Sequence, residues 1–273
     1  MVISAVSSSK AFLRGLGVVE LAPATTPFDP GYDPITVEGH LVQSAHLMAG
    51  LKISMACWMI ADENETRRKV AAARRAKVST VCGGTPFEVA VAQGQLAPYL
   101  DLCADIGFAR IECAEGFAPL RLAPEELMKM AAERGLEVQF ELGRKHGGPM
   151  TPAEADALVA QGRAWLEVGA TTVVIEARES AESVGLFDAE GALDGALADR
   201  FAAAFSLEKV VFEAPTKGSQ FALINHFGPQ VRLGNVRLEE LLRVEIYRRG
   251  LHSDALGLDK LRPGPPPEDR APH

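Results

Sequence analysis

Short apolar runs alternate with longer amphipathic segments along almost the whole chain. The apolar runs occupy residues 17–22, 51–54, 78–82, 109–113, 137–142, 171–177, 209–214 and 230–235. The helix-like segments occupy residues 38–50, 62–77, 95–107, 124–135, 151–169, 195–206, 219–228 and 237–250. This alternation, without consecutive hairpin strands, indicates a parallel sheet whose strands are joined by helical crossovers.

The number of repeated units favours one particular parallel fold. Eight units over roughly 240 residues match the size of a (β/α)8 barrel. A doubly wound open sheet is the alternative, but it usually carries a GxGxxG turn after its first strand, and none follows residues 17–22. We therefore predict an α/β protein with the (β/α)8 TIM-barrel fold over residues 14–256. An extension at residues 1–13 precedes the barrel, and a Pro-rich tail at residues 257–273 is expected to be disordered.

Composition narrows the class of protein. The 273 residues carry a formal net charge of −8, which argues against non-specific nucleic-acid binding. The four cysteines form no CxxC pair, so neither a zinc site nor a disulfide framework is expected, and a reducing cytoplasm fits. Residues 1–17 are too weakly apolar for a signal peptide, and no run of about 18 apolar residues predicts a membrane span. The segment at residues 237–250 has apolar surface for the barrel and for a partner, so a homo-oligomer is expected.

Four consecutive apolar runs end in a glutamate, where a core strand would be expected to continue with apolar residues. These glutamates are Glu112, Glu141, Glu176 and Glu213. Because the C-terminal strand ends of a barrel meet at one mouth, we expect the four carboxylates to lie together. Two carboxylates at about 4 Å repel by roughly 4 kcal/mol at an effective dielectric constant near 20, so cations or protons must compensate them. The alternative is that each glutamate forms a structural ion pair of its own.

Basic residues follow the same predicted strands. Lys52 ends the second run, Arg144 and Lys145 follow the fifth, Arg178 follows the sixth and Lys217 follows the seventh. A mouth with both signs of charge suits an anionic substrate together with a divalent metal, and carboxylate oxygens favour a hard ion such as Mg²⁺. A zinc site would more often use His or Cys ligands, and no His pair has the required spacing.

Two glycine-containing turns are candidate anion sites. Gly83 and Gly84 follow the third run, and Gly234 and Asn235 end the eighth run directly before a helix-like segment. Exposed backbone N–H groups and the helix dipole at such positions bind anions, and barrels often bind phosphate near their last two loops. The alternatives are a tight turn at the first position and an ordinary helix cap at the second.

The segments "GGTPFEVA", "IECAEG", "FELGRK", "VIEARES", "FEAPTKGSQ", "FGPQVRLGNV" and "RRGLHSD" occur in an order and spacing that resemble the phosphosulfolactate synthase family. The resemblance covers roughly residues 50–256, and "IEARES" and "FEAP…FGP…LGN" are its specific parts. It implies a (β/α)8 barrel that uses Mg²⁺ to add sulfite to phosphoenolpyruvate, giving 2-phospho-3-sulfolactate. An enolate intermediate, stabilised by Mg²⁺ and cations, would then be protonated by a general acid.

The resemblance also implies roles for individual residues. The family's basic pair appears here as Arg144-Lys145. Because arginine stays protonated up to a pH of about 12, we expect Lys145 to be the acid and Arg144 to clamp a carboxylate or phosphate, with Arg178 beside them. The implied metal ligands are Glu112, Glu141, Glu176 and Glu213. The implied substrate-binding residues are Lys52, Gly83, Gly84, Lys217, Gln220, Gly234 and Asn235.

The chain departs from the family pattern at two loops. The Gly-rich loop that follows the family's strand-two lysine is replaced by "ISMACWMIA", which contains Met55 and Trp58, and Asp29-Pro30-Gly31 aligns with an Asp-x-Gly only across an insertion. The start "GVVELAP" resembles divergent relatives, including plant heat-stress proteins, and His252 replaces an arginine. Two alternatives therefore stand beside the synthase. One is a related lyase, hydratase or C–S bond-forming enzyme acting on another phosphorylated or enolisable substrate. The other is a non-catalytic stress-tolerance barrel.

Overall fold

The computed structural model describes residues 8–116, 119–120 and 122–261. Within them, eight parallel strands close into a barrel, each pairing with the next and β8 with β1. The strands are β1 (Thr25–Asp29), β2 (Leu51–Ile53), β3 (Thr80–Cys82), β4 (Arg110–Ala114), β5 (Glu137–Leu142), β6 (Val173–Ile175), β7 (Val210–Glu213) and β8 (Leu233–Arg237). The predicted (β/α)8 TIM-barrel fold is therefore confirmed.

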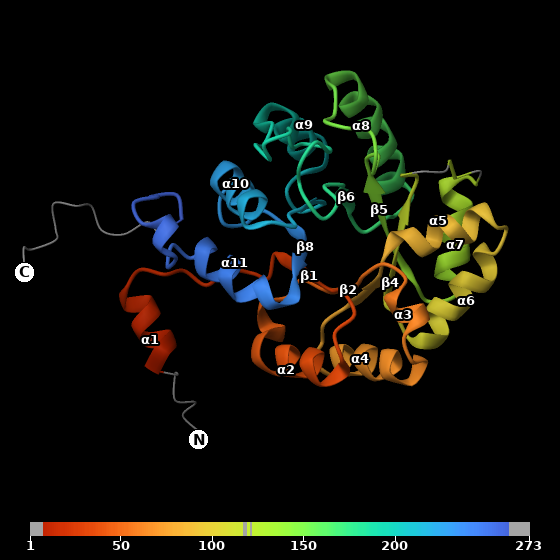
Figure 1. Cartoon of the computed structure of the whole chain (residues 1–273), viewed down its shortest axis with the longest axis horizontal. Helices are drawn as coiled ribbons and strands as arrows, with labels where there is room; N and C mark the ends of the chain where they lie inside the picture. The colour runs from red at the N-terminus through yellow and green to blue at the C-terminus, as the bar shows by residue number, and fades with distance from the viewer. Residues whose placement is uncertain (1–7, 117–118, 121, 262–273) are drawn as a thin grey trace, which may run out of the picture.

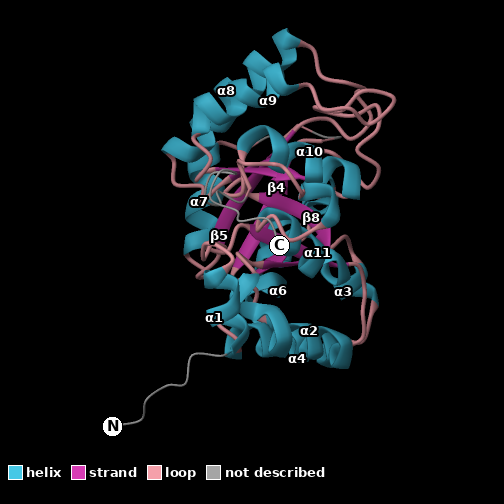
Figure 2. Ribbon diagram, turned by 90° about the vertical axis from the view of Figure 1, so that its left-hand side faces the viewer, coloured by secondary structure: helices cyan, strands magenta, loops and turns pink. Residues whose placement is uncertain are grey.

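Helices surround the barrel on its outside. They are α1 (Ser8–Gly15), α2 (Pro34–Ser44), α3 (Cys57–Ile60), α4 (Glu63–Arg75), α5 (Gly84–Ala92), α6 (Leu96–Ile106), α7 (Pro124–Ala132), α8 (Pro152–Glu167), α9 (Gly195–Phe205), α10 (Lys217–Phe227) and α11 (Leu241–Arg248). Figures 1 and 2 show α8 and α9 on the side of the molecule opposite α2 and α4. No helix among the described residues is long and apolar enough to cross a bilayer.

The first strand lies later in the chain than predicted. Residues 17–22 form no strand, and β1 is the segment "TTPFD" at Thr25–Asp29. This segment has few apolar residues and contains Pro27, which cannot donate a hydrogen bond to a strand neighbour. The register against β8 shifts between Thr25 and Pro27, and this irregularity accommodates the proline. Thr25 is fully buried because its hydroxyl donates to Glu245, a partner that no local pattern reveals.

The other predicted strands agree with the structure to within a few residues, and several helix ends form as their sequences indicate. Gly107 ends α6 in the left-handed conformation, and Thr151 caps α8 in a capping box with Glu154. The short helices α1 and α3 were not predicted, and two further helices differ from the prediction. α2 begins four residues earlier than expected because Asp33 caps it and Pro34 occupies its first turn, and α5 begins at Gly84, where only a turn was expected.

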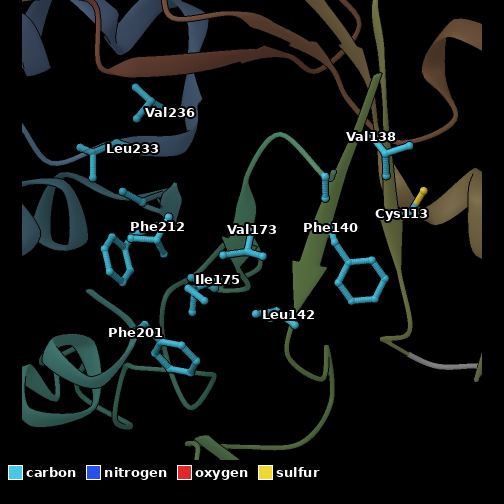
Figure 3. Close-up of a cluster of buried hydrophobic side chains, with 14 of the residues drawn as sticks. Cys113, Val138, Phe140, Leu142, Val173, Ile175, Phe201, Phe212, Leu233 and Val236 are labelled. Atoms are coloured by element: carbon cyan, nitrogen blue, oxygen red, sulfur yellow. The ribbon is translucent and has the colours of Figure 1, made fainter. Parts of the chain in front are cut away.

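The core lies between the barrel and its helices. Alternate strand residues point outward and are apolar, and Figure 3 shows some of them from β4 to β8 together with Phe201 of α9. Phe140 of β5 stacks on Trp165 of α8 with ring centroids 4.3 Å apart, and both tryptophans of the chain, Trp58 and Trp165, are buried in this core. The inward-facing residues are largely polar, including Arg110, Glu112, Gln139 and Thr172. The barrel interior is therefore a polar column that opens at the C-terminal ends of the strands.

The ends of the described chain lie close to the predicted domain limits. α1 (Ser8–Gly15) crosses the limit placed at residue 13, and Leu261, inside the predicted tail, is buried against the core. The remainder of the predicted extension and tail, residues 1–7 and 262–273, lies outside the described residues.

Candidate active site

A cavity of about 360 Å³ opens at the C-terminal ends of the strands. All four strand-end glutamates line it, together with Lys52, Lys145 and Arg178. The remaining lining residues are Ser54, Met55, Gly83, Gly84, Thr85, Glu179, Ser180 and Asn235. The structure therefore brings the four predicted glutamates and three of the five predicted basic residues together in one mouth.

Lys52 of β2 forms ion pairs with two of the four carboxylates. Its Nζ lies 2.7 Å from Glu112 Oε1 and 3.4 Å from Glu213 Oε1, and all three side chains are buried. Burial by itself lowers the pKa of Lys52, but the nearby carboxylates outweigh it and raise that pKa. Burial likewise opposes ionisation of Glu112, yet Lys52 holds the pKa of Glu112 below its ordinary value. This lysine is therefore a fixed positive charge between two strands.

The oxygens of Glu112 and Glu213 are fully engaged. Glu112 Oε1 also accepts from the Gly84 N–H at 3.1 Å, and Glu112 Oε2 accepts from Gln139 Nε2 at 2.7 Å. Glu213 Oε2 accepts from the Ala177 N–H at 3.0 Å. Neither carboxylate has a buried oxygen without a hydrogen-bond partner. These two glutamates therefore hold Lys52 and the neighbouring backbone in place.

The other two glutamates surround Lys145. Lys145 Nζ lies 3.3 Å from Glu141 Oε1 and 3.5 Å from Glu176 Oε2, and it donates to Thr85 Oγ1 at 3.5 Å. Although Glu141 Oε1 and Glu176 Oε2 are within ion-pair distance of this ammonium, neither buried oxygen accepts a hydrogen bond from a described residue. Buried carboxylate oxygens of this kind favour binding of a further cation or donor.

Burial and mutual repulsion weaken the acidity of this second pair. Burial, followed by the charges of Glu176 and Glu112, raises the pKa of Glu141 well above its ordinary value. Burial and the nearby Glu213 raise the pKa of Glu176 to about 7. Burial alone lowers the pKa of Lys145, but the surrounding carboxylates outweigh it and raise this pKa, so Lys145 is protonated at neutral pH. Lys145 is thus a protonated amine enclosed by carboxylates.

Backbone geometry fixes Glu176. A Cβ at Gly143 (φ +127°) would lie 2.9 Å from Glu176 Cβ, and one at Gly185 (φ +56°) would lie 2.4 Å from the Glu176 carbonyl oxygen. Only glycine fits at either place. The Arg178 N–H then donates to Glu176 Oε1 at 2.6 Å. The loop after β6 is therefore closely packed around this one carboxylate.

Left-handed residues gather at the mouth. Met55 (φ 51°), Arg178 (φ 57°) and Asn235 (φ 49°) all adopt this sparsely populated conformation, and all three line the cavity. Non-glycine residues in this region cost about 1–3 kcal/mol each and persist where the surrounding structure requires them, commonly at functional sites. Arg178 is exposed, and the buried Oδ1 of Asn235 has no described hydrogen-bond partner.

The N-terminus of α5 forms one wall of the mouth. A Cβ at Gly83 would lie 2.7 Å from the backbone nitrogen of Met55, so β2 and β3 end too close together for any larger residue. No side chain caps α5 at Gly83, and Gly84 and Thr85 both face the cavity. The predicted anion site at this turn is therefore a helix N-terminus in the mouth, although Glu112 already accepts from the Gly84 N–H.

Three predicted site residues lie elsewhere, and one lies beneath the mouth. Arg144 lines a separate cavity of about 170 Å³ beside α8. Lys217 pairs with Asp254 at 2.8 Å and is half exposed, and the buried Gln220 donates to Glu240 at 2.8 Å. Gly234 faces the barrel interior below the mouth. Of the two basic residues after β5, only Lys145 enters the mouth.

Other functional residues were not foreseen in the sequence. Ser54 and Thr85 line the mouth, and Gln139 reaches it from inside the barrel by binding Glu112. Thr85 comes directly after the two glycines that follow β3. Once α5 is recognised as a helix that begins there, this position indicates that Thr85 lies at the mouth. Asp29 ends β1, but its carboxylate pairs with the buried Lys69 at 2.6 Å, so it is held as a structural ion pair.

The side chains of the mouth would bind a magnesium ion only together with water or substrate oxygens that complete its coordination. Among the described residues, no group of three or more His, Cys, Asp or Glu side chains is arranged as a complete metal site. Mg²⁺, however, is usually bound through one or two carboxylates plus water and substrate oxygens. The unpartnered oxygens of Glu141 and Glu176 fit that kind of incomplete site.

Comparisons with known proteins point to one family. A sequence model of the family described as (2R)-phospho-3-sulfolactate synthase (ComA) matches residues 23–254. The phosphosulfolactate synthase of Methanocaldococcus jannaschii is 31% identical over 247 residues, covering 90% of this chain and 95% of that protein. The phosphosulfolactate synthase of Methanothermobacter thermautotrophicus is 29% identical over 234 residues, covering 85% and 91% respectively.

A solved structure supports the fold independently. The 3-dehydroquinate dehydratase of Enterococcus faecalis superposes with a TM-score of 0.52 at 11% identity, covering 83% of this chain and 94% of that one. Likeness at this identity concerns the barrel alone, whereas the family match spans nearly all of the described residues. The chain therefore belongs to the (2R)-phospho-3-sulfolactate synthase family and is a lyase that forms a carbon–sulfur bond.

Proposed function

We propose that this enzyme adds sulfite to phosphoenolpyruvate in a Mg²⁺-dependent reaction that yields 2-phospho-3-sulfolactate. The observation that carries the proposal is the pairing of Lys145 with Glu141 and Glu176, whose inner oxygens lack hydrogen-bond donors. A protonated amine and two unsatisfied carboxylates in one mouth supply both a proton donor and a cation site. The family membership of the chain favours the same reaction.

Glu141 and Glu176 are the residues that would hold Mg²⁺. When bound, the ion would act as a Lewis acid on the oxygens that gain negative charge during the addition. Glu112 and Glu213 are less suited to this role because Lys52 and backbone N–H groups already occupy their oxygens. Of the four glutamates expected from the sequence to bind the metal, we therefore propose only Glu141 and Glu176 as ligands.

The addition itself needs one nucleophile and one proton. The sulfur lone pair of sulfite forms a bond to C3 of phosphoenolpyruvate, and the C2–C3 π electrons move toward the carboxylate to give an enolate. The Lys145 ammonium then delivers a proton to C2, which completes the product and leaves a neutral amine to be reprotonated from solvent. The phosphate ester remains on C2 throughout.

The remaining charges of the mouth would bind the substrate. Lys52, a permanent cation between Glu112 and Glu213, would stabilise negative charge that develops at the centre of the mouth. Arg178 and the α5 N-terminus would bind the phosphate group from the rim. Arg178 thereby takes the clamping role that the sequence assigned to Arg144, which lines another cavity.

One incubation tests the proposal. The protein is mixed with phosphoenolpyruvate, sulfite and Mg²⁺, and products are followed by ³¹P NMR and mass spectrometry. We expect phosphosulfolactate to accumulate, to require all three components, and to cease when EDTA removes the metal. An absence of product with intact, folded protein would contradict the proposed reaction.

Met55 favours a second candidate function. This residue is 44% exposed and, among the described residues, has the one large apolar side chain lining the mouth. An apolar wall suits a phosphorylated enol that carries an apolar substituent on C3, with the same addition chemistry. Turnover of such an enol in preference to phosphoenolpyruvate, and a reversal of that preference in Met55→Gly, would favour this candidate.

A further inference from the structure

A file of polar side chains runs inside the barrel up to the mouth. At its lower end Arg110 of β4 pairs with Glu137 of β5 at 2.6 Å. Arg110 Nη1 donates to Gln139 Oε1 at 3.5 Å, and Gln139 Nε2 donates to Glu112 Oε2 at 2.7 Å. Glu112 Oε1 in turn lies 2.7 Å from Lys52 Nζ. The file thus links the barrel interior to a central charge of the mouth.

The amide of Gln139 can take only one orientation in this file. Its oxygen faces a guanidinium, which only donates, and its nitrogen faces an ionised carboxylate, which only accepts. A reversed amide would place two acceptors together at Glu112 and two donors together at Arg110. Gln139 is buried, at 6% exposed, so its amide depends on these two partners. Its N–H is therefore a fixed donor to Glu112.

That donor determines where the other oxygen of Glu112 points. With Oε2 held by Gln139, Oε1 is directed to Lys52 and to the Gly84 N–H at the start of α5. Without the amide, Oε2 would lose its donor, and only Lys52 and the Gly84 N–H would oppose rotation of the carboxylate about its last bond. Rotation would weaken the shorter ion pair of Lys52 and leave Glu213, at 3.4 Å, as its fixed partner.

We infer that Gln139 is a positioning residue for the addition reaction. From inside the barrel it orients Glu112, and through Glu112 it holds the Lys52 ammonium at the centre of the mouth. Its effect on the reaction rate rests on the proposed function, whereas its effect on Lys52 does not.

Thr172 supplies a matched control. It is buried in the same interior layer, on the chain just before β6, and its hydroxyl has no described hydrogen-bond partner. Thr172→Val removes a polar group at similar depth without touching the file of residues that ends at Lys52.

The first measurement follows Lys52 directly. Lysines are acetylated under limiting reagent, and peptide mass spectrometry gives the rate at each site, with the buried, Asp29-paired Lys69 as internal reference. In Gln139→Met we expect Lys52 to react roughly tenfold faster, the equivalent of one lost hydrogen bond to a charged group, while Lys69 is unchanged. An unchanged Lys52 rate, or an equal increase in Thr172→Val, would overturn the inference.

The second measurement follows turnover. Gln139→Met is expected to lower kcat roughly tenfold with KM unchanged, because the displaced charge acts on the enolate-like transition state. In a Lys52→Met background the same change should have no further effect, because Gln139 acts through Lys52. Fully additive effects would overturn the inference. A wild-type enzyme that forms no phosphosulfolactate would instead overturn the proposed function and leave the acetylation result standing.

Discussion

At the scale of single residues, the mouth divides four identical carboxyl groups into two kinds. Glu112 and Glu213 are tied to Lys52 and to backbone donors, so they are anchors; Lys52 lowers the pKa of Glu112, whereas burial raises the pKa of Glu213. Glu141 and Glu176 keep unpartnered oxygens and have raised pKa values, so they are available to a cation or a proton. The division follows from neighbours and, for Glu112, from position, because Glu112 lies in the middle of β4 opposite Gln139, deeper than its predicted strand-end place.

Replacing Lys145 tests the proton donor. Lys145→Met should lower kcat by about 10²–10⁴-fold, the usual contribution of a general acid. Lys145→Arg should lose nearly as much, because arginine keeps the positive charge but does not release its proton at neutral pH. Lys209→Met, at an exposed lysine directly before β7 and at the end of the barrel away from the mouth, should leave kcat unchanged. Steady-state kinetics of the three variants measure this, and full activity of Lys145→Arg would exclude proton donation.

The titration of Glu176 predicts how stability depends on pH. Burial and Glu213 raise its pKa from 4.5 to about 7, so the folded state binds a proton that the unfolded state releases. The resulting stabilisation is present below pH 4.5 and is lost as pH rises to about 7; its upper limit is about 3 kcal/mol. In metal-free protein, Glu176→Gln should therefore be increasingly more stable than wild type between these values. Urea denaturation at several pH values checks this, and a constant difference would contradict it.

The sequence could predict which carboxylates reach the mouth, but not which of the two basic residues after β5 does. A glutamate that ends an apolar strand must emerge at the barrel rim, so its place follows from strand pattern alone. Arg144 and Lys145 are adjacent on a loop, and the loop conformation decides which one turns inward. That conformation depends on Gly143 at φ +127° and on the close approach of Gly147 to Arg144, neither of which is a periodic signal.

At the scale of secondary-structure elements, the strands that were predicted correctly share one property. Each has outward-facing apolar residues that pack on helices, so its pattern is local. β1 lacks this signal: its burial depends on Thr25 bonding to Glu245 and Arg248 of α11, which lies 220 and 223 residues away. α5 was missed because two glycines and a proline within its first turn are typical of a turn as well as of a helix start.

Thr25→Val tests this distant anchor of β1. The change keeps the shape but removes the hydroxyl that bonds Glu245 at 2.7 Å and Arg248 at 3.3 Å. Leaving these buried groups short of a partner should cost about 1–3 kcal/mol of unfolding free energy. Because Thr25 is at the end of the barrel away from the mouth, kcat should not change. Thr172→Val, whose hydroxyl has no described partner, is the matched control and should cost less.

The contact between α8 and α9 depends on a glycine. A Cβ at Gly162 of α8 would lie 2.5 Å from Phe205 Cζ of α9 and 2.9 Å from Leu142 Cδ1 of β5. Gly162→Ala should therefore destabilise the protein by about 1–3 kcal/mol through overpacking. Gly39→Ala, on the exposed face of α2 with nothing within 4 Å, should instead stabilise it by about 0.4–1 kcal/mol. Denaturant unfolding of both variants measures these opposite signs, and equal effects would contradict the packing argument.

At the scale of the whole molecule, the barrel separates two kinds of interior. The layer between strands and helices is apolar, and the column inside the strands is polar and ends in the mouth. Because the column is hydrogen-bonded and charged, it holds the charged side chains of the mouth in position. The outer layer supplies most of the buried apolar area. Stability and chemistry are thus largely assigned to opposite faces of the same strands.

The cysteines report on global unfolding. Cys82, Cys103 and Cys113 are buried and free, and Cys57 is partly buried with its thiol donating to the Ser54 carbonyl. A thiol reagent added to native protein should therefore modify at most Cys57 quickly, with the other three reacting only as fast as the molecule unfolds. Mass spectrometry over time distinguishes the two classes, and rapid modification of all four would contradict this packing.

The pairing of β1 with β8 also bears on how the protein is made. The ring is closed by hydrogen bonds between residues near 25 and residues near 235, so it stays open during translation until β8 has emerged from the ribosome. Until then β1 and β7 each present an unpaired strand edge, the kind of surface on which unfinished chains adhere to one another. Premature termination after Glu213 but before residue 233 should therefore yield insoluble fragments, even though every residue of the Lys145 cage would already have been synthesised.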